Sequence, residues 1–465
     1  MIRVAFGVTA GRAKLKRWFI CGVWLMGVVA WGMAAQGGKK PGQRQGREFC
    51  LDSRAGSDQG EGSRLHPWRT LGPLGRVTFV PGDRVLFACG SEFVGGVEVK
   101  ESGTAEEPIV LQAVGKGAKP RFRNPGLEVL DGNGIRVSGS YVVIEGLFFS
   151  ECPKNPVEAD IHQLGAVFLS AGAEHCVVRG CEMTRTPIGV TVYGEHDVVE
   201  GNWIHDDNEP IEAHWGPMGI VVCGSHNEVA GNRVVNYCAP SNEYGHDGGA
   251  IEINDRALPK EDIHIHGNLS LRNQGFIEFV GRVKQDNFRI DHNVCEDYQS
   301  FIGFTGPCTN ILVDHNTVVR TLAHEQDDSE DVVFWNYSDG GPNGAILIRN
   351  NIFVYAGLRV EPVFSRGEFD HICNLFYRVD ADSIPPQANH AAYVRKYLGG
   401  GARLRMGDKI GDPLFRDMTG GDFHLRAGSP AIGMGADLGY ERDFDGKVIP
   451  KLKLPDVGAF EFEGD

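Results

Sequence analysis

The sequence lacks the motifs of several large enzyme classes. It has no Gly-x-Ser-x-Gly nucleophile elbow, no phosphate-binding loop and no dinucleotide-binding fingerprint. Its 11 cysteines form no Cys-x-x-Cys pair and no Cys/His spacing of the kind that binds zinc. These absences argue against a serine esterase of the α/β-hydrolase type, a nucleotide-binding enzyme and a cysteine-based zinc site.

Long apolar runs are also missing after residue 35. The run from Trp18 to Trp31 is apolar but shorter than a membrane span, and it lies between a basic start and a stretch of small residues. We expect residues 1–35 to be a signal peptide, with an uncleaved N-terminal anchor as the alternative. We therefore expect a secreted, periplasmic or cell-surface protein with no membrane span in the mature chain, and a monomer.

Positive charge is scarce. Without residues 1–35 the chain has 41 Lys and Arg against 61 Asp and Glu, a net charge of −20. Such a surface repels nucleic acid and anionic lipid, so we expect no nucleic-acid partner. It also disfavours a strongly anionic polymer as substrate, unless a cation bridges the two.

Cysteines are frequent enough for disulfides in an exported chain. Cys50 with Cys89, or Cys223 with Cys238, are conceivable pairs. The alternative is that the cysteines are small residues of the core or of stacked positions.

An internal repeat is the decisive feature that the sequence does have. One segment type alternates apolar residues and in most copies ends in Gly-Asn, His-Asn or Asn-Asn, at spacings of roughly 21 to 36 residues. Its copies are Val142–Phe149, Cys176–Met183, Asp197–Ile204, Asn227–Val234, Ile263–Ser270, Phe288–Cys295, Ile311–Val318 and Ile346–Phe353. We expect the recurring Asn to lie at a bend between strands, where its amide can bond to the Asn above and below.

A second strand type follows each copy of the first except the last. Its members are Gly165–Gly172, Ile188–Gly194, Met218–Gly224, Gly249–Asp255, Gly275–Gly281, Ser300–Gly306 and Val332–Ser338. The period-2 alternation marks strands with one buried face, and stacked coils would share that core. The sequence thus predicts an all-β chain, a right-handed parallel β-helix.

The two flanks resemble a known group of proteins. FCLDSRAGSDQGEGSRLHPWRTL, VPGDRVLFACG and GTAEEPIVLQA resemble the entry segment of secreted, pectate-lyase-like β-helix polysaccharide lyases and glycoside hydrolases. DPLFRDMTGGDFHLRAGSPAIGMGAD and DVGAFEFE are similar to the end of bacterial surface β-helix proteins. The resemblance implies a capping helix at the start, a closing strand at the end and a polysaccharide or oligosaccharide as partner. We expect a cap with the first coils at 36–125, repeats at 126–380 and a closing segment at 381–465.

Alignment of the second strands predicts the direction of each side chain. The columns of Ile251 and Ile253 are apolar and should face inward, so the column between them should face solvent. That column is expected to contain Phe168, Thr191, Val221, Glu252, Glu278, Gly303 and Phe334, and the next outward column to contain Ser170, Tyr193, Cys223, Asn254, Val280, Thr305 and Asn336.

Glu252 and Glu278 are therefore predicted to stack on successive coils. Like charges about 4.8 Å apart repel and should raise one pKa. The spacing matches the carboxyl pair of retaining glycosidases, at about 5–5.5 Å. The alternatives are a pair relieved by solvent or by basic neighbours, and a bound Ca²⁺ ion, for which paired carboxylates are equally suited.

Other polar residues flank this pair in the sequence. As further catalytic residues we predict Asp255, His246 and Lys284. As substrate-binding residues we predict Trp215, His214, Asp247, Asn254, Arg282 and Tyr193. Trp215 in a polar loop is interpreted either as a sugar-stacking platform or as a loop anchor.

Three functions follow as hypotheses. The first is a glycoside hydrolase that uses Glu252 and Glu278. The second is a calcium-dependent polysaccharide lyase with Lys284 or Arg282 as base, for which the chain lacks a clear Asp cluster. The third is a noncatalytic surface protein that binds glycans.

Overall fold

The computed structural model describes residues 46–154, 156, 160–211, 215–242, 245–254, 258–281, 283–322, 333–336, 344–356, 370–379 and 406–464. The predicted signal peptide, residues 1–35, lies outside this range. Within it, no helix is both long enough and apolar enough to cross a membrane.

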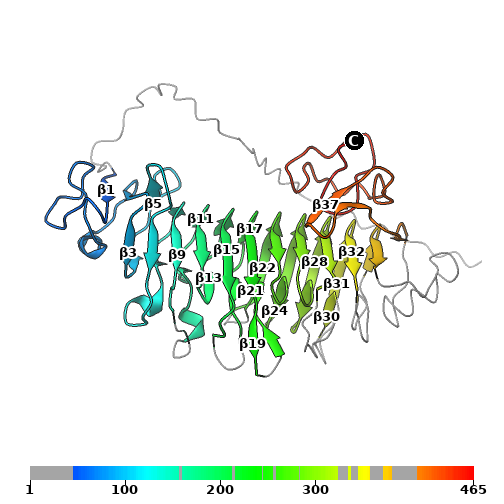
Figure 1. Ribbon diagram of the computed structural model, residues 1–465, viewed down its shortest axis with the longest axis horizontal. Coiled ribbons are helices and arrows are strands. Elements are labelled where there is room, and N and C mark those ends of the chain that lie inside the picture. The colour runs from blue at the N-terminus through cyan, green and yellow to red at the C-terminus, as the bar shows by residue number, and fades with distance from the viewer. Residues whose placement is uncertain are drawn as a thin grey trace, which may run out of the picture. The chain divides into compact units, whose positions relative to one another are not determined.

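Three parallel sheets make up the body of the described chain, as Figure 1 shows by the row of strands running from β1 and β3 to β31 and β32. Sheet A has the order β1 (Glu48–Leu51), β2 (Arg84–Ala88), β5 (Ile109–Val114), β8 (Val142–Glu145), β11 (Val177–Arg179), β14 (Val198–Glu200), β17 (Glu228–Ala230), β22 (Lys260–His266), β25 (Gln285–Asp291), β28 (Cys308–Asp314), β31 (Gly344–Arg349) and β33 (Asp370–Ile372). Sheet B has the order β3 (Glu92–Val94), β6 (Arg121–Arg123), β9 (Phe148–Ser150), β12 (Glu182–Thr184), β15 (Trp203–Asp207), β18 (Arg233–Tyr237), β23 (Leu269–Leu271), β26 (Val294–Glu296), β29 (Thr317–Arg320), β32 (Ile352–Tyr355), β34 (Leu375–Arg378) and β35 (Lys409–Ile410). Sheet C has the order β4 (Val97–Val99), β7 (Ile135–Val137), β10 (Val167–Leu169), β13 (Ile188–Val192), β16 (Met218–Val222), β21 (Gly249–Ile253), β24 (Ile277–Phe279), β27 (Ile302–Phe304) and β30 (Phe334–Asn336).

Each coil passes through sheets C, A and B in turn, as β13, β14 and β15 do, and then rises to the next coil. This is the parallel β-helix that the repeat predicted. The sequence predicted two strands a coil, and the structure has three, because the Asn-type segment bends in its middle. In residues 197–204, Gly201 and Asn202 form the turn between β14 and β15.

A ladder of asparagines fixes that turn. From Asn232 onward, the Oδ1 of each Asn accepts from the backbone N–H and the side-chain amide of the Asn one coil earlier, as between Asn268 and Asn293 at 3.0 and 3.0 Å, while Asn202 accepts from the backbone N–H of Cys181. The ladder contains Asn202, Asn232, Asn268, Asn293, Asn316, Asn351 and Asn374, and it ends on Asp408. All seven Asn side chains are buried, so the expected stacking of amides at the bend is confirmed.

The residue before each Asn explains the Gly-Asn and His-Asn pairs. It takes a left-handed backbone conformation, with φ of 59° at Gly201 and 50° at His292. Glycine adopts this conformation without steric cost, and Asn and His tolerate it better than most residues. The pair therefore combines a turn-forming residue with an inward hydrogen-bonding residue.

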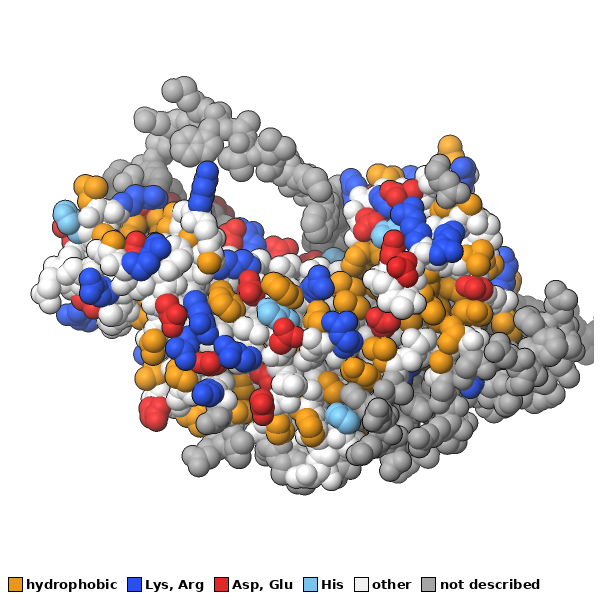
Figure 2. Space-filling model, viewed as in Figure 1, with side chains coloured by type: hydrophobic (Ala, Val, Ile, Leu, Met, Phe, Trp, Pro, Cys, Tyr) orange, Lys and Arg blue, Asp and Glu red, His pale blue; other side chains and the backbone are white. Residues whose placement is uncertain are grey.

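A continuous apolar core fills the space between the sheets. Rings of successive coils stack inside it, as Phe279 does on Phe304 with centroids 5.3 Å apart and Phe276 on Phe301 at 5.4 Å. Outside, acidic and basic side chains are interspersed on the face in view (Figure 2). The core runs along the whole solenoid, and the polar turns between the strands form the surface.

The two ends differ from what the family resemblance implied. The start has a short 3₁₀ helix, Gly72–Arg76, where a capping helix was expected; two further 3₁₀ helices are Leu130–Gly132 and Ile161–Gln163. Near the end, β36 (Phe415–Asp417) and β37 (Asp422–Leu425) form an antiparallel hairpin. The DVGAFEFE segment is not a strand: Gly458 and Ala459 donate single hydrogen bonds to Asn350 (2.8 Å) and Thr317 (2.9 Å).

The cysteines form no disulfide among the described residues. Neither Cys50 with Cys89 nor Cys223 with Cys238 forms a disulfide, so neither conceivable pair is present. Most of the described cysteines are buried, which agrees with their interpretation as small core residues. The division into 36–125, 126–380 and 381–465 stays a prediction. Sheets A and B already begin at β1 and β3, before residue 126.

The ladder gives a stability prediction. Asn293→Ala removes a side chain that accepts two hydrogen bonds and donates to Ile265 (3.1 Å) and Asn316 (2.9 Å). Because buried partners are left unsatisfied, we expect a loss of about 1–3 kcal/mol in the free energy of unfolding, measured by urea denaturation. Asn242→Ala, at an exposed turn residue, should change it by less than about 0.5 kcal/mol; equal losses would contradict a ladder role.

Candidate functional site

Glu252 and Glu278 pair directly across neighbouring strands of sheet C. β21 and β24 lie in the predicted register, with Ile251 opposite Ile277 and Glu252 opposite Glu278. The flanking apolar residues are at most 3% exposed and belong to the core. Since side chains alternate along a strand, both glutamates point away from the core. We call them the carboxylate pair.

The two carboxyl groups have different surroundings. Asn254 donates its amide to Glu252 Oε1 at 2.5 Å, which stabilises a carboxylate there. Burial raises the pKa of Glu278 to about 8, and the nearby charges of Glu252 and Asp247 raise it further in the same direction. Glu278 is therefore protonated at neutral pH beside an acceptor, and the raised pKa expected for one member of the pair is present.

Asp247 reaches the pair from a separate hairpin. β19 (Ala239–Ser241) and β20 (Gly245–Asp247) form this hairpin between sheets B and C. The backbone N–H of Gly216 donates to Asp247 at 2.9 Å, while burial raises the pKa of its carboxyl. His246 precedes it in β20 and is partly buried. The insert thus brings a third carboxyl near the pair.

The outward column is covered on the coils before Glu252. Phe168, Thr191 and Val221 are only 2–5% exposed, although this column was expected to face solvent throughout. Leu164 and Ile211, from the segments that lead into sheet C, pack over it in a small apolar cluster. The prediction of direction was correct and the prediction of exposure was wrong, because these loops fold back onto the sheet.

On the coils after Glu278 the column continues with a buried glycine and a partly buried tryptophan. Gly303 lies opposite Glu278, and Trp335 lies opposite Gly303. A methyl group placed on Gly303 would lie 3.6 Å from Glu278 Cγ and 3.6 Å from an edge carbon of the Trp335 ring. Ser300 Oγ lies 3.7 Å from the same point, so a methyl group there would just fill the gap between the acid and the indole.

Trp335 was missed because the last strand was aligned one residue out of register. Phe334 was predicted to face outward, but it pairs with Ile302 and is fully buried. Asn336, predicted in the outer column, pairs with inward-facing Phe304. Two large aromatic residues in succession fit either register in a period-2 pattern, and only the pairing distinguishes them.

The remaining predicted residues fall into two groups. Tyr193 packs on Phe168 with ring centroids 5.5 Å apart, and burial and Cys223 raise its pKa, with a smaller contribution from the charge of Glu252. Trp215 is 37% exposed and meets His162 edge to face at 6.4 Å. Asp255, His214 and Arg282 lie outside the described residues.

Lys284 has a partner of its own. Its Nζ lies 2.6 Å from Asp286 Oδ2, and this contact is the first of the causes that lower the pKa of Asp286 to about 2. The side chain is 56% exposed. This exposed ion pair gives no support to Lys284 as a base, and its catalytic role stays a prediction.

No protein-family model and no curated protein sequence matches the chain. Solved structures do share its fold. Pectate lyase Pel9A is 15% identical with a TM-score of 0.57, over 91% of this chain and 98% of that one. XylC in complex with xylose is 10% identical with a TM-score of 0.51, over 90% and 99%. A rhamnogalacturonan lyase is 13% identical with a TM-score of 0.51, over 90% and 97%. The predicted right-handed parallel β-helix of the pectate-lyase-like kind is thereby confirmed as the fold.

The raised pKa of Glu278 gives a prediction on stability. Its carboxyl binds a proton more tightly in the folded state, with a pKa of about 8, than in the unfolded chain. This stabilisation is complete below about pH 4.5 and is lost as the pH rises through about 8. Glu278→Gln is neutral throughout, so its free energy of unfolding relative to wild type should rise between pH 5 and 9.

We expect that rise to be on the order of 1–3 kcal/mol, because partial exposure of the carboxyl screens the effect. Urea denaturation of both proteins at the two pH values measures it. Glu98→Gln, at an exposed glutamate of β4 in the same sheet, is the control and should keep a constant difference from wild type. A constant difference for Glu278→Gln as well would contradict the raised pKa.

Proposed function

We propose that this protein is a carbohydrate-active enzyme that hydrolyses glycosidic bonds with retention of configuration. Glu278 acts as general acid and base, and Glu252 acts as the nucleophile. The observation that carries the proposal is the carboxylate pair, in which one member is protonated at neutral pH and the other accepts a hydrogen bond from Asn254.

The spacing of the pair supports this chemistry. Neighbouring strands are about 4.8 Å apart, and retaining glycosidases hold their two carboxyl groups at about 5–5.5 Å. Inverting enzymes need about 6.5–9.5 Å, because a water molecule must fit between carboxylate and sugar. Directly paired residues of adjacent strands therefore favour retention.

The reaction has two steps. Glu278 donates its proton to the glycosidic oxygen while Glu252 attacks the anomeric carbon, so the leaving sugar departs and an ester to Glu252 forms. Glu278, now a carboxylate, then takes a proton from a water molecule that attacks the same carbon and releases Glu252. During the intermediate Glu252 carries no charge, so its contribution to the raised pKa of Glu278 is lost and the Glu278 carboxylate serves as the base.

Trp335 offers a platform for a sugar ring. Indole faces pack against apolar faces of ligands, and the strand pairing places Trp335 in the same outward column as Glu278, with only Gly303 between them in the column. The covered column before Glu252 would end the binding site on the other side. The solved structures of similar fold support a sugar polymer as substrate, since two are named as polysaccharide lyases and one contains xylose. We propose that the protein acts on such a polymer outside the cytoplasm.

A calcium-dependent lyase is the second candidate, because two of those structures are lyases. Glu252, Glu278 and Asp247 supply the oxygen ligands that Ca²⁺ prefers. However, the ion would require Glu278 to lose its proton. Among the described residues, the clusters in which three His, Cys, Asp or Glu ligand atoms lie within 4.8 Å of one another include neither member of the pair. The hydrolase therefore has the better support.

Substitution of the pair tests the hydrolase. Glu252→Gln and Glu278→Gln should each lower kcat at least 1000-fold, as loss of a nucleophile or a proton donor does on the scale of general acid–base and covalent catalysis, about 10²–10⁴-fold or more. Release of reducing ends from a polysaccharide panel measures activity, and circular dichroism checks the fold. Activity of both variants within a few fold of wild type would rule out the mechanism.

Two controls distinguish the lyase mechanism from the hydrolase mechanism. Lys284→Met should leave hydrolysis unchanged, and chelation of calcium should not reduce it. Products with ultraviolet-absorbing unsaturated ends, formed only with calcium, would favour the lyase instead.

Trp335 should affect binding more than chemistry. Trp335→Ala is expected to raise KM roughly 2–10-fold with a small change in kcat, since aromatic stacking contributes about 0.5–1.5 kcal/mol. Trp203→Ala, at an exposed residue of sheet B that stacks on His205, is the matched control and should leave KM unchanged. Equal KM values in all three proteins would show that Trp335 does not contact substrate.

A further inference from the structure

A column of histidines lies at the turn between sheets C and A. His175, His196 and His226 occupy the same place on three successive coils, each just before a strand of sheet A. Their rings stack with centroids 4.9 and 4.8 Å apart and interplanar angles of 10° and 9°. The column is the product of a recurring short motif, Glu-His at 174–175 and 195–196 and Ser-His at 225–226.

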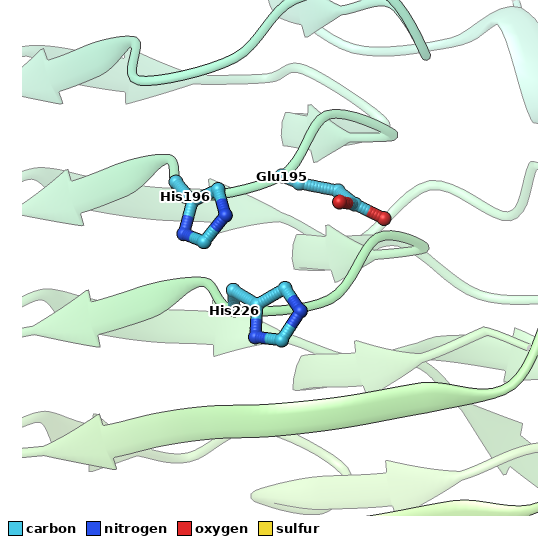
Figure 3. A group of neighbouring side chains, drawn as sticks. All are labelled: Glu195, His196 and His226. Atoms are coloured by element: carbon cyan, nitrogen blue, oxygen red, sulfur yellow. The ribbon is translucent and has the colours of Figure 1, made fainter.

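Two of these histidines share a carboxylate. Glu195, His196 and His226 each offer one ligand atom, and these atoms lie within 4.8 Å of one another. Figure 3 shows the two imidazoles one above the other, with a ring nitrogen of each on the side where Glu195 lies. Glu195 and His196 are exposed and His226 is partly exposed, so the three side chains are accessible to solvent.

The next coil orients the second imidazole. Asp262 Oδ2 lies 3.2 Å from His226 Nδ1, and Asn287 donates its amide to the other oxygen of Asp262. A carboxylate on Nδ1 holds the proton there and leaves the Nε2 lone pair for a ligand bond. Metal-binding histidines are commonly oriented by a carboxylate in this way.

We propose that Glu195, His196 and His226 bind a divalent transition-metal ion of the zinc type, with Asp262 as positioning residue for His226. Two imidazoles and one carboxylate are a ligand set that zinc uses with water in the remaining position. Bonds of about 2.0–2.2 Å to each ligand require the donor atoms to approach one another from their present separation. The exposed side chains of Glu195 and His196 can make this movement by rotation about their own bonds.

Other candidate ligand groups fit a metal less well. His226 also forms a cluster with Glu261 and Asp262, but that cluster has one imidazole instead of two, and Asp262 already contacts His226 Nδ1 and accepts from Asn287.

His175 continues the stack but belongs to no such ligand cluster among the described residues. Glu228, His264 and His266 do form one, but His266 Nε2 lies 2.9 Å from Glu228 and His264 Nε2 lies 2.5 Å from Asp291. Those nitrogens already have partners, so an ion would have to displace them.

Binding of zinc chloride to the full chain, followed by isothermal titration calorimetry, tests the site. We expect one ion per chain, at least tenfold weaker binding in His196→Asn and His226→Asn, and unchanged binding in His175→Asn. Asparagine suits these positions because φ is 59° at His196 and 61° at His226, and Asn287 and Asn310 adopt the same conformation farther along the column. The control thus changes the stack without removing a ligand.

Two further measurements test the zinc site, one through thermal stability and one through the positioning residue. Zinc should raise the unfolding temperature of the wild type and of His175→Asn, but not of His226→Asn. Each protein with zinc is compared with the same protein in chelator, so that a loss of stability caused by the substitution alone does not enter the result. Asp262→Asn should weaken zinc binding about 10–100-fold while the ion still binds, as loss of an orienting carboxylate does. Absence of zinc binding, equal binding in His226→Asn, or a loss seen only with His264→Asn would each overturn the assignment.

Discussion

Stacking of coils in register places every residue about 4.8 Å from its counterparts on the coils above and below. Any side chain in this fold must therefore be compatible with its neighbours in the column. Apolar residues meet the condition by packing, and asparagine meets it because its amide both donates and accepts, as between Asn268 and Asn293. Imidazoles meet it by ring stacking, as at His196 and His226. Two carboxylates do not meet it without a proton or a cation.

The same constraint explains how much the sequence could reveal. Alternating apolar residues recur in every coil and Asn recurs in most of them, so the solenoid, the inward faces and the pairing of Glu252 with Glu278 could be predicted. Features that occur on single coils gave no such signal. The loops that cover Val221 do not repeat, and Phe334 and Trp335 fit either register until the strand pairing is known. The third sheet was hidden because its strands directly follow the Asn turn.

The histidine column shows a second limit of sequence reasoning. A search for zinc ligands by short spacing finds nothing, because Glu195, His196 and His226 lie on two coils. Ligands in a solenoid are adjacent in space at separations of one coil. Alignment of the turns that precede sheet A, in addition to the strands, would have brought these residues together, and the His-containing motif at 174–175, 195–196 and 225–226 was the available signal.

The carboxylate pair and the histidine column respond in opposite ways to a cation. Glu278 keeps its proton because burial and the negative charges of Glu252 and Asp247 make ionisation costly. A divalent ion at the pair would remove that cost, lower the pKa of Glu278 and take away the proton that a glycosidase needs. Glu195 with two imidazoles meets no such conflict, since an ion there displaces no proton from a carboxyl group that must keep it. The arrangement of charges therefore separates the two sites by chemistry: proton transfer belongs at the pair, and metal binding belongs at the turn.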